Sequence, residues 1–163
     1  MTTELLSLFE AEALAQERLP EVIYDSIAGG ATDEITVRRP RHIYDSIMLR
    51  PRRLVDVSRR DFATEVLGHQ ISMPIMLAPT GFQERVHKLG ELATAKAAGS
   101  LGTVMIQSSG ATFTLEEVAH AATGPIWFQH YLYSDHGLTK SMAQRAQAAG
   151  YSALCITVDA SVP

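Results

Sequence analysis

Two patterns of hydrophobic and polar residues follow one another along the chain. In residues 4–19 the apolar positions recur every three or four residues, which predicts a helix that Pro20 ends. Residues 21–28 predict a second, shorter helix that stops at a pair of glycines. A further turn or helix is expected after it, and residues 43–67 are irregular. We therefore expect residues 1–72 to form an N-terminal extension that leads into the main domain.

From residue 73 onward, short apolar runs alternate with stretches that have a helical pattern. Apolar runs bounded by turn residues are typical of strands buried on both faces, and their alternation with helices indicates βαβ units and a parallel sheet. The expected strands cover residues 73–78, 103–106, 126–132 and 153–158, and the expected helices cover residues 88–100, 114–122 and 136–149.

Polar side chains stand at the end of every expected strand. Because side chains two apart on a strand share a face, each later strand offers its polar groups on one side. Delivery of polar groups from the carboxyl ends of adjacent parallel strands is the arrangement of a barrel active site. A doubly wound sheet usually carries a G-x-G-x-x-G motif, which is absent here. The strand-end residues are Thr80, then Gln107, Ser108 and Ser109, then Gln129 and Tyr131, and finally Thr157 and Asp159.

The sequence therefore predicts an α/β fold of the (β/α)8 TIM-barrel type. A full barrel has eight β/α units over about 250 residues. Residues 73–163 supply about the first four units, after the N-terminal extension. The pattern predicts an extension followed by half a barrel.

Composition and charge further limit the class of protein. The 163 residues are 46% hydrophobic and 20% charged, with a formal net charge of −4, which is ordinary for a globular domain. No apolar run has the length of a membrane-spanning helix, and the start of the chain does not have the pattern of a signal peptide. The single cysteine, Cys155, is compatible with a reducing compartment, so we expect a cytoplasmic protein.

Basic residues are concentrated in one stretch. Eight of the fourteen are arginines between residues 38 and 60. A nucleic-acid or phosphate contact is one interpretation. A solvated or subunit-facing surface, paired with Asp45, Asp56 and Asp61, fits the acidic chain better, so we expect no nucleic-acid partner.

The strand-end groups are mostly neutral hydrogen-bonding side chains, which suit a planar heterocycle better than a metal or a phosphate. The amide of Gln129 donates and accepts at once, and the hydroxyl of Thr157 does either, so an isoalloxazine ring would fit. Gly81 would let its backbone approach such a ring closely. Simpler roles stay open, because Thr80 and Ser108 also suit turns or caps and Asp159 could cap a following helix.

Several motifs together resemble the FMN-dependent 2-hydroxy acid oxidoreductases, the family of glycolate and lactate oxidases, mandelate dehydrogenases and lactate monooxygenases. The resemblance covers the whole chain in order. The motifs are Leu19-Pro20, Val22-Ile23-Tyr24-Asp25, Ala28 to Glu34, Arg50-Pro51-Arg52, Met73 to Thr80, Gly90-Glu91, Ser108-Ser109, Trp127 to Tyr131 and Ile156 to Asp159.

The resemblance implies FMN as the cofactor and oxidation of an (S)-2-hydroxy acid to a 2-oxo acid in a TIM barrel. The backbone of Pro79-Thr80-Gly81 would lie beside the flavin N5. Ser108, Gln129 and Thr157 would hydrogen-bond the polar edge of the ring.

The same resemblance assigns substrate-binding and catalytic roles. Tyr24 would bind the substrate carboxylate, and Tyr131 would contact the carboxylate or the hydroxyl oxygen. Asp159 would orient the catalytic histidine and stabilise its charged form.

The family's catalytic histidine, its substrate-binding arginines, the lysine near flavin N1 and the phosphate site all lie after the fourth strand. The chain is therefore expected to need the C-terminal half of the barrel as a partner, and full-length members are often tetramers. The alternative is a truncated, non-catalytic half barrel with an unpaired edge at its fourth strand.

Overall fold

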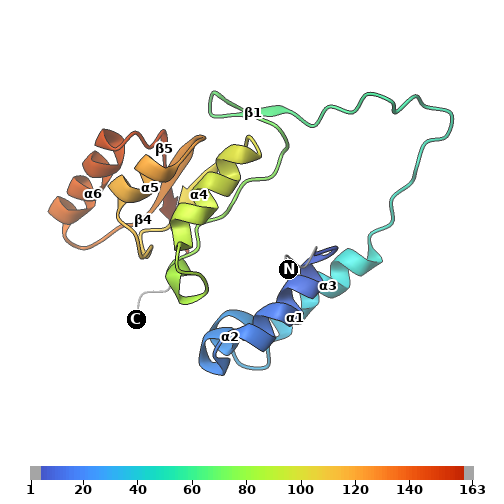
Figure 1. Cartoon of the computed structure of the whole chain (residues 1–163), viewed down its shortest axis with the longest axis horizontal. Helices are drawn as coiled ribbons and strands as arrows, with labels where there is room; N and C mark the ends of the chain where they lie inside the picture. The colour runs from blue at the N-terminus through green and yellow to red at the C-terminus, as the bar shows by residue number, and fades with distance from the viewer. Residues whose placement is uncertain (1–4, 160–163) are drawn as a thin grey trace. The chain divides into compact units, whose positions relative to one another are not determined.

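The computed structural model describes residues 5–159, and the chain divides into two compact units, Met1–Arg59 and Arg60–Pro163. The first unit holds the helices α1 (Leu8–Arg18), α2 (Glu21–Ala28) and α3 (Ile35–Ser46), drawn in blue to cyan in Figure 1. The helices expected over residues 4–19 and 21–28 are confirmed as α1 and α2.

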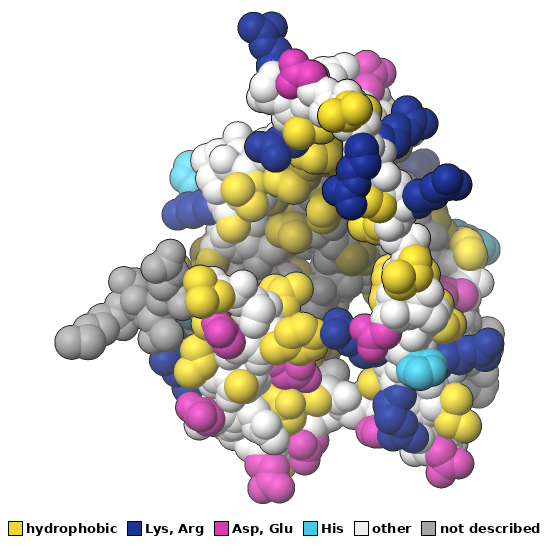
Figure 2. Space-filling model, turned by 90° about the vertical axis from the view of Figure 1, so that its right-hand side faces the viewer, with side chains coloured by type: hydrophobic (Ala, Val, Ile, Leu, Met, Phe, Trp, Pro, Cys, Tyr) yellow, Lys and Arg dark blue, Asp and Glu magenta, His cyan; other side chains and the backbone are white. Residues whose placement is uncertain are grey.

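The described surface of the first unit mixes charged with exposed hydrophobic side chains, and its helices have no buried residue. In the described part of α1, α2 and α3, every side chain is exposed or half-buried. Two of the clustered arginines pair with acids one helical turn away, Arg38 with Glu34 at 3.3 Å and Arg41 with Asp45 at 3.5 Å. On the face drawn in Figure 2, hydrophobic side chains lie exposed among basic and acidic ones.

The second unit begins with a β-hairpin that starts within residues 43–67, which were expected to be irregular, and ends just beyond them. Strands β1 (Thr64–Val66) and β2 (His69–Ile71) are antiparallel, with Thr64 opposite Ile71. The two turn residues, Leu67 and Gly68, have φ angles of 47° and 80°. Two consecutive positive φ values match the twist of hairpin strands. Leucine rarely adopts a positive φ, so the sequence pattern did not predict a turn at this position.

The main sheet contains three parallel strands in the order β3-β4-β5. Each strand matches an expected one. The helices expected over residues 114–122 and 136–149 lie between these strands, and the one expected over residues 88–100 precedes the first, which confirms the βαβ pattern (Figure 1). The strands are β3 (Met105–Gln107), β4 (Ile126–Tyr131) and β5 (Ala153–Thr157), and the helices are η1 (Gln83–Arg85), α4 (Gly90–Ser100), α5 (Leu115–Ala121) and α6 (His136–Ala148).

The prediction of a complete strand over residues 73–78 is wrong. Its segment makes a single parallel bridge, from Leu77 to Met105. The Leu77 N–H donates to the Val104 carbonyl, and the Leu77 carbonyl accepts from the Ile106 N–H, both at 3.0 Å. Pro74 and Pro79 flank this bridge and have no N–H to donate, so pairing stays local.

Each face of the sheet buries its own core. On the helix side, Met105 and Phe128 pack with Leu115 and Val118 of α5 and with residues of α4 and α6. On the opposite face, Val104, Ile106 and Trp127 pack with Ile71 of the hairpin. The side chains alternate along β4, so the second face is the inner face, which also carries Gln129 beyond Trp127.

Candidate active site

Gln129 is the centre of a hydrogen-bonded group at the carboxyl ends of the strands. Its side chain is only 2% exposed. Its Oε1 accepts from the Ser109 N–H at 3.1 Å, from the Ser108 hydroxyl at 3.3 Å and from the Ser109 hydroxyl at 3.4 Å. Its Nε2 donates to Thr157 Oγ1 at 2.7 Å. The structure thus brings together Ser108, Gln129 and Thr157, as the strand-end pattern predicts.

The loop after the Leu77 bridge lies against the loop after β3. The Phe82 N–H donates to the Gly110 carbonyl at 3.0 Å. A Cβ added to Gly81 would lie 2.8 Å from the same carbonyl oxygen. Gly81 therefore permits the close approach of these two loops. Pro79 and Thr80 precede the contact and are exposed at the end of the segment.

Two further predicted residues lie at the same end of the sheet. Tyr131 is the last residue of β4, stands opposite Thr157 in the strand register and is 42% exposed. Asp159 follows β5 by two residues and is exposed. The expected capping of a following helix by Asp159 concerns residues after 159, which lie outside the described residues.

Tyr24 lies on α2 in the first unit, where its side chain is half-buried. Its expected contact with a substrate carboxylate therefore stays a prediction.

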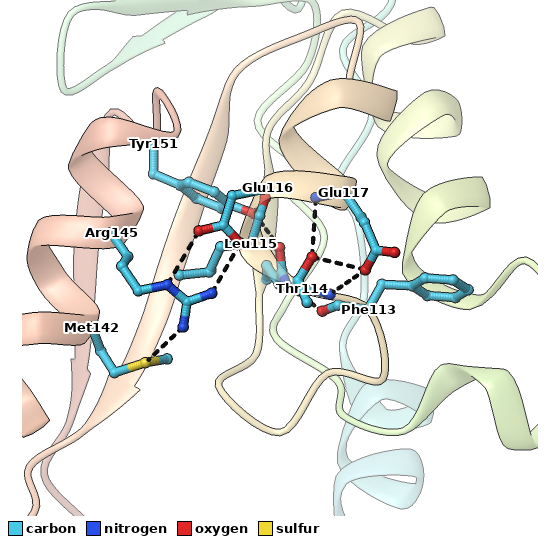
Figure 3. Close-up of polar contacts among 9 residues, drawn as sticks. Phe113, Thr114, Leu115, Glu116, Glu117, Met142, Arg145 and Tyr151 are labelled. Carbon is cyan, nitrogen blue, oxygen red and sulfur yellow. Dashed lines mark hydrogen bonds and ion pairs between the residues drawn. The ribbon is translucent and has the colours of Figure 1, made fainter.

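The loop that carries Ser108 and Ser109 is fixed at its far end by α5 (Figure 3). Thr114 caps the helix: its Oγ1 accepts from the Glu117 N–H at 3.3 Å, and the Glu117 carboxylate accepts from the Thr114 N–H at 2.9 Å. These hydrogen bonds from Thr114 hold the pKa of Glu117 below its usual value. The cap fixes the point at which the loop ends.

A second set of contacts ties the same helix to α6. Arg145 donates to Glu116 through Nε at 3.1 Å and through an Nη at 2.9 Å, and this contact lowers the pKa of the Glu116 carboxyl (Figure 3). A cavity of about 180 Å³ lies beside it, between the loop after β3, Met142 and Arg145.

Sequence reasoning missed two buried polar residues near this site. Glu91, on α4, is fully buried, and its Oε1 accepts from the backbone of both loops. His130 is fully buried on the helix side of β4, where its ring lies 5.4 Å from those of Phe128 and Tyr133. Burial lowers the pKa of His130. Both residues stood in motifs, Gly90-Glu91 and Trp127 to Tyr131, but the motifs did not identify either side chain as a buried polar group.

Within residues 5–159, no group of three or more His, Cys, Asp or Glu side chains is placed to hold a metal ion. None of the helices described is long and apolar enough to cross a membrane.

Comparison with known proteins gives the class to which this sheet and site belong. A family profile described as FMN-dependent dehydrogenase matches residues 15–163. The chain belongs to the FMN-dependent 2-hydroxy acid dehydrogenase family. This confirms the resemblance carried by the motifs.

Individual relatives agree with this assignment. The chain is 46% identical over 155 residues to glycolate oxidase 3 from Oryza sativa subsp. indica, covering 95% of this chain and 42% of that protein. It is 48% identical over 161 residues to the L-lactate oxidase of Nostoc sp., covering 96% of this chain and 44% of that protein.

Solved structures confirm the fold class as that of the TIM-barrel FMN dehydrogenases. A soluble mutant of the membrane-associated (S)-mandelate dehydrogenase from Pseudomonas putida superposes with a TM-score of 0.93 at 36% identity, covering 98% of this chain and 45% of that one. A lactate oxidase from Pediococcus acidilactici gives a TM-score of 0.94 at 31% identity, covering 99% and 45%. The chain thus spans less than half the length of these relatives.

Proposed function

We propose that the chain supplies the N-terminal half of the active site of an enzyme that oxidises an (S)-2-hydroxy acid to a 2-oxo acid with FMN, as a dehydrogenase, oxidase or monooxygenase. The observation that carries the proposal is the hydrogen-bonded group around Gln129. It stands at the carboxyl ends of parallel strands, where barrel enzymes have their active sites.

The residues present fit a flavin ring. The group around Gln129 consists of neutral amide and hydroxyl groups, which match a heterocycle edge with alternating donors and acceptors. The amide Nε2 carries two hydrogens and gives one to Thr157, so the second is free for another acceptor. When bound, FMN would accept the two electrons removed from the substrate, with reduction at N5.

In this proposal the chain's own residues bind the flavin ring and orient the substrate. Ser108, Gln129 and Thr157 would hold the polar edge of the ring, and the backbone of Pro79-Thr80-Gly81 would lie beside its N5. Tyr131 contacts the substrate hydroxyl or carboxylate.

Two further roles complete the proposed site. Tyr24 binds the substrate carboxylate, and Asp159 orients a histidine that the rest of the barrel supplies. A carboxylate in this role stabilises the charged imidazole after it has taken up the hydroxyl proton.

A second candidate is a non-catalytic half barrel, favoured by the outer face of β5. Leu154 and Ile156 there are 44% and 36% exposed, whereas Phe128 and His130, opposite them on β4, are fully buried. Among the described residues β5 also ends the sheet, so a partner would pair with its edge and cover this face, without chemistry of its own.

The test is an FMN titration of the chain, followed by the quenching of flavin fluorescence, alone and with a polypeptide that corresponds to the C-terminal half of the Nostoc L-lactate oxidase. We expect saturable binding that Gln129→Leu weakens, and flavin reduction by glycolate, L-lactate or (S)-mandelate only in the two-part complex. Exposed Tyr44→Phe, outside the proposed machinery, is the control. Absence of binding both alone and in the complex would favour the second candidate.

A further inference from the structure

Glu91 connects two loops of the candidate active site to α4. It lies in the first turn of that helix and is fully buried. Its Oε1 accepts from the Gln83 N–H and from the Thr112 N–H, each at 3.2 Å. Gln83 is the first residue of η1, at the end of the loop that follows Thr80, and Thr112 belongs to the loop that follows β3. One carboxylate oxygen thus holds the backbone of both loops.

A second residue of α4 extends this contact to Thr80. Thr94 stands one turn after Glu91, and its hydroxyl donates to Gln83 Oε1 at 2.5 Å. The Gln83 Nε2 in turn donates to the Thr80 carbonyl at 3.1 Å. A continuous path of hydrogen bonds therefore runs from α4 to the segment that precedes Gly81. We call Gln83, Glu91 and Thr94 the α4 clamp.

Burial of the Glu91 carboxyl group in the clamp is unfavourable in free energy unless its contacts offset it. Burying a carboxyl group is unfavourable unless it is hydrogen-bonded. The second oxygen of Glu91, Oε2, is buried and has no hydrogen-bond partner in the described part of the chain. Helix formation does not need this side chain, because α4 is otherwise rich in alanine. The contacts that offset the cost are those to the two loops.

We propose that Glu91 and Thr94 are positioning residues, which hold the loops at residues 80–83 and 110–112 in the conformation that receives the flavin. The inference rests on the proposed function. The loops also touch each other directly, through the Phe82 N–H and the Gly110 carbonyl at 3.0 Å. That contact sets their spacing, and the clamp sets their orientation relative to the sheet.

The structure distinguishes the effects of two substitutions at Glu91. Glu91→Gln keeps a carbonyl oxygen that can accept from both backbone donors. Glu91→Leu is similar in size and removes the acceptor, which leaves two backbone N–H groups unpaired. Each unpaired buried donor corresponds to a change of roughly fivefold to 150-fold in an equilibrium constant, and here two donors are affected.

The experiment measures two quantities in the same variants: hydrogen exchange of the Gln83 and Thr112 amides by NMR, and FMN affinity by fluorescence quenching. For Glu91→Leu we expect both amides to exchange about tenfold faster or more, and FMN to bind about tenfold more weakly or worse. Glu91→Gln should stay within about threefold of the wild type in both. Glu84→Leu, the same substitution at an exposed glutamate of η1, is the matched control.

Thr94→Val provides a second test if Glu91→Leu fails to fold. It removes only the hydroxyl and should weaken FMN binding by about threefold to tenfold, with the Thr112 amide still protected. The inference is wrong if the folded variants bind FMN as tightly as the wild type, even with faster amide exchange, because the clamp is then merely structural. Lack of FMN binding by the wild-type chain, both alone and with the C-terminal half, would instead refute the proposed function, and the inference with it.

Discussion

The Gln129 side chain donates to Thr157 Oγ1 at 2.7 Å across two neighbouring parallel strands. Gln129 is almost fully buried, so its amide depends on this partner. Thr157→Val keeps the shape of the side chain and removes the acceptor. We expect a loss of about 1–3 kcal/mol in the free energy of unfolding, because a buried donor is left unpaired. Urea unfolding measures this loss.

Thr157→Ser is the matched control for this prediction, because it keeps the hydroxyl. It should recover most of the stability and most of the FMN affinity that the valine variant loses. Equal losses in both variants would show that the methyl group, rather than the hydrogen bond, matters at this position.

The second prediction concerns the contact between Gly81 and Gly110. A Cβ at Gly81 would lie 2.8 Å from the Gly110 carbonyl oxygen, too close for any real Cβ, so Gly81→Ala must move one of the loops. A Cβ at Gly110 would meet its nearest neighbour, Ser108 Oγ, at 3.6 Å, an ordinary contact. We expect Gly81→Ala to weaken FMN binding by about tenfold, and Gly110→Ala to change it by less than about threefold.

Fluorescence titration of both variants checks this prediction. An additional probe is the Phe82 amide, which donates to the Gly110 carbonyl. Its hydrogen exchange should become faster in Gly81→Ala only. If Gly110→Ala proves the more damaging change, the 110 loop is constrained by something other than Gly81.

The sequence predicted the centre of the site because its residues follow strand periodicity. Gln129 and Thr157 occupy inner-face positions of β4 and β5, and polar side chains at the ends of apolar runs are visible in the pattern. The pattern predicts Ser109 as a strand-end residue, but its backbone contact to Gln129 depends on the turn that follows β3. The pattern therefore predicted the cluster better than its individual hydrogen bonds.

Features that arise from tertiary contacts could not be predicted in this way. Glu91 contacts residues 8 and 21 positions away along the chain, which no local period encodes. The hairpin turn places Leu67 at a positive φ, against the preference of that residue. The segment around Leu77 has the apolar pattern of a buried strand. It forms only one bridge, because the prolines on either side have no N–H to donate.

The third prediction concerns Tyr151, which joins the strand that follows α6 to the loop after β3. Its hydroxyl donates to Gln107 Oε1 and contacts the Leu115 carbonyl at 3.0 Å, as Figure 3 shows for Leu115. Burial raises the pKa of this hydroxyl well above its usual value of 10.0. Tyr151→Phe should cost about 1–3 kcal/mol of unfolding free energy, because two buried acceptors lose their donor.

The control for this change is Tyr44→Phe, at a side chain that is 73% exposed, and it should leave the urea midpoint nearly unchanged. The loop after β3 also carries Ser108 and Ser109, so Tyr151→Phe is expected to weaken FMN binding as well, though less than Gln129→Leu. Unchanged stability in the Tyr151 variant would mean that water replaces the hydroxyl as the donor.

The fourth prediction is a pH dependence of stability that comes from His130. Burial on the helix side of β4 holds the pKa of His130 below its usual value of 6.5. Below pH 6.5 the unfolded chain therefore binds a proton that the folded chain still rejects, and folding stability falls as the pH falls through this window. Above it the contribution of His130 to stability is fully present.

His130→Leu replaces the ring with an apolar side chain of similar size, which removes this proton linkage. We expect the urea midpoint of the variant to change less between pH 7.5 and pH 5.5 than that of the wild type, and to be higher at the acid end. The exposed His120→Leu is the control and should follow the wild-type pH dependence. If wild type and His130→Leu lose stability in parallel over this range, acid sensitivity comes from other groups and His130 is protonated in the folded chain as readily as in the unfolded one.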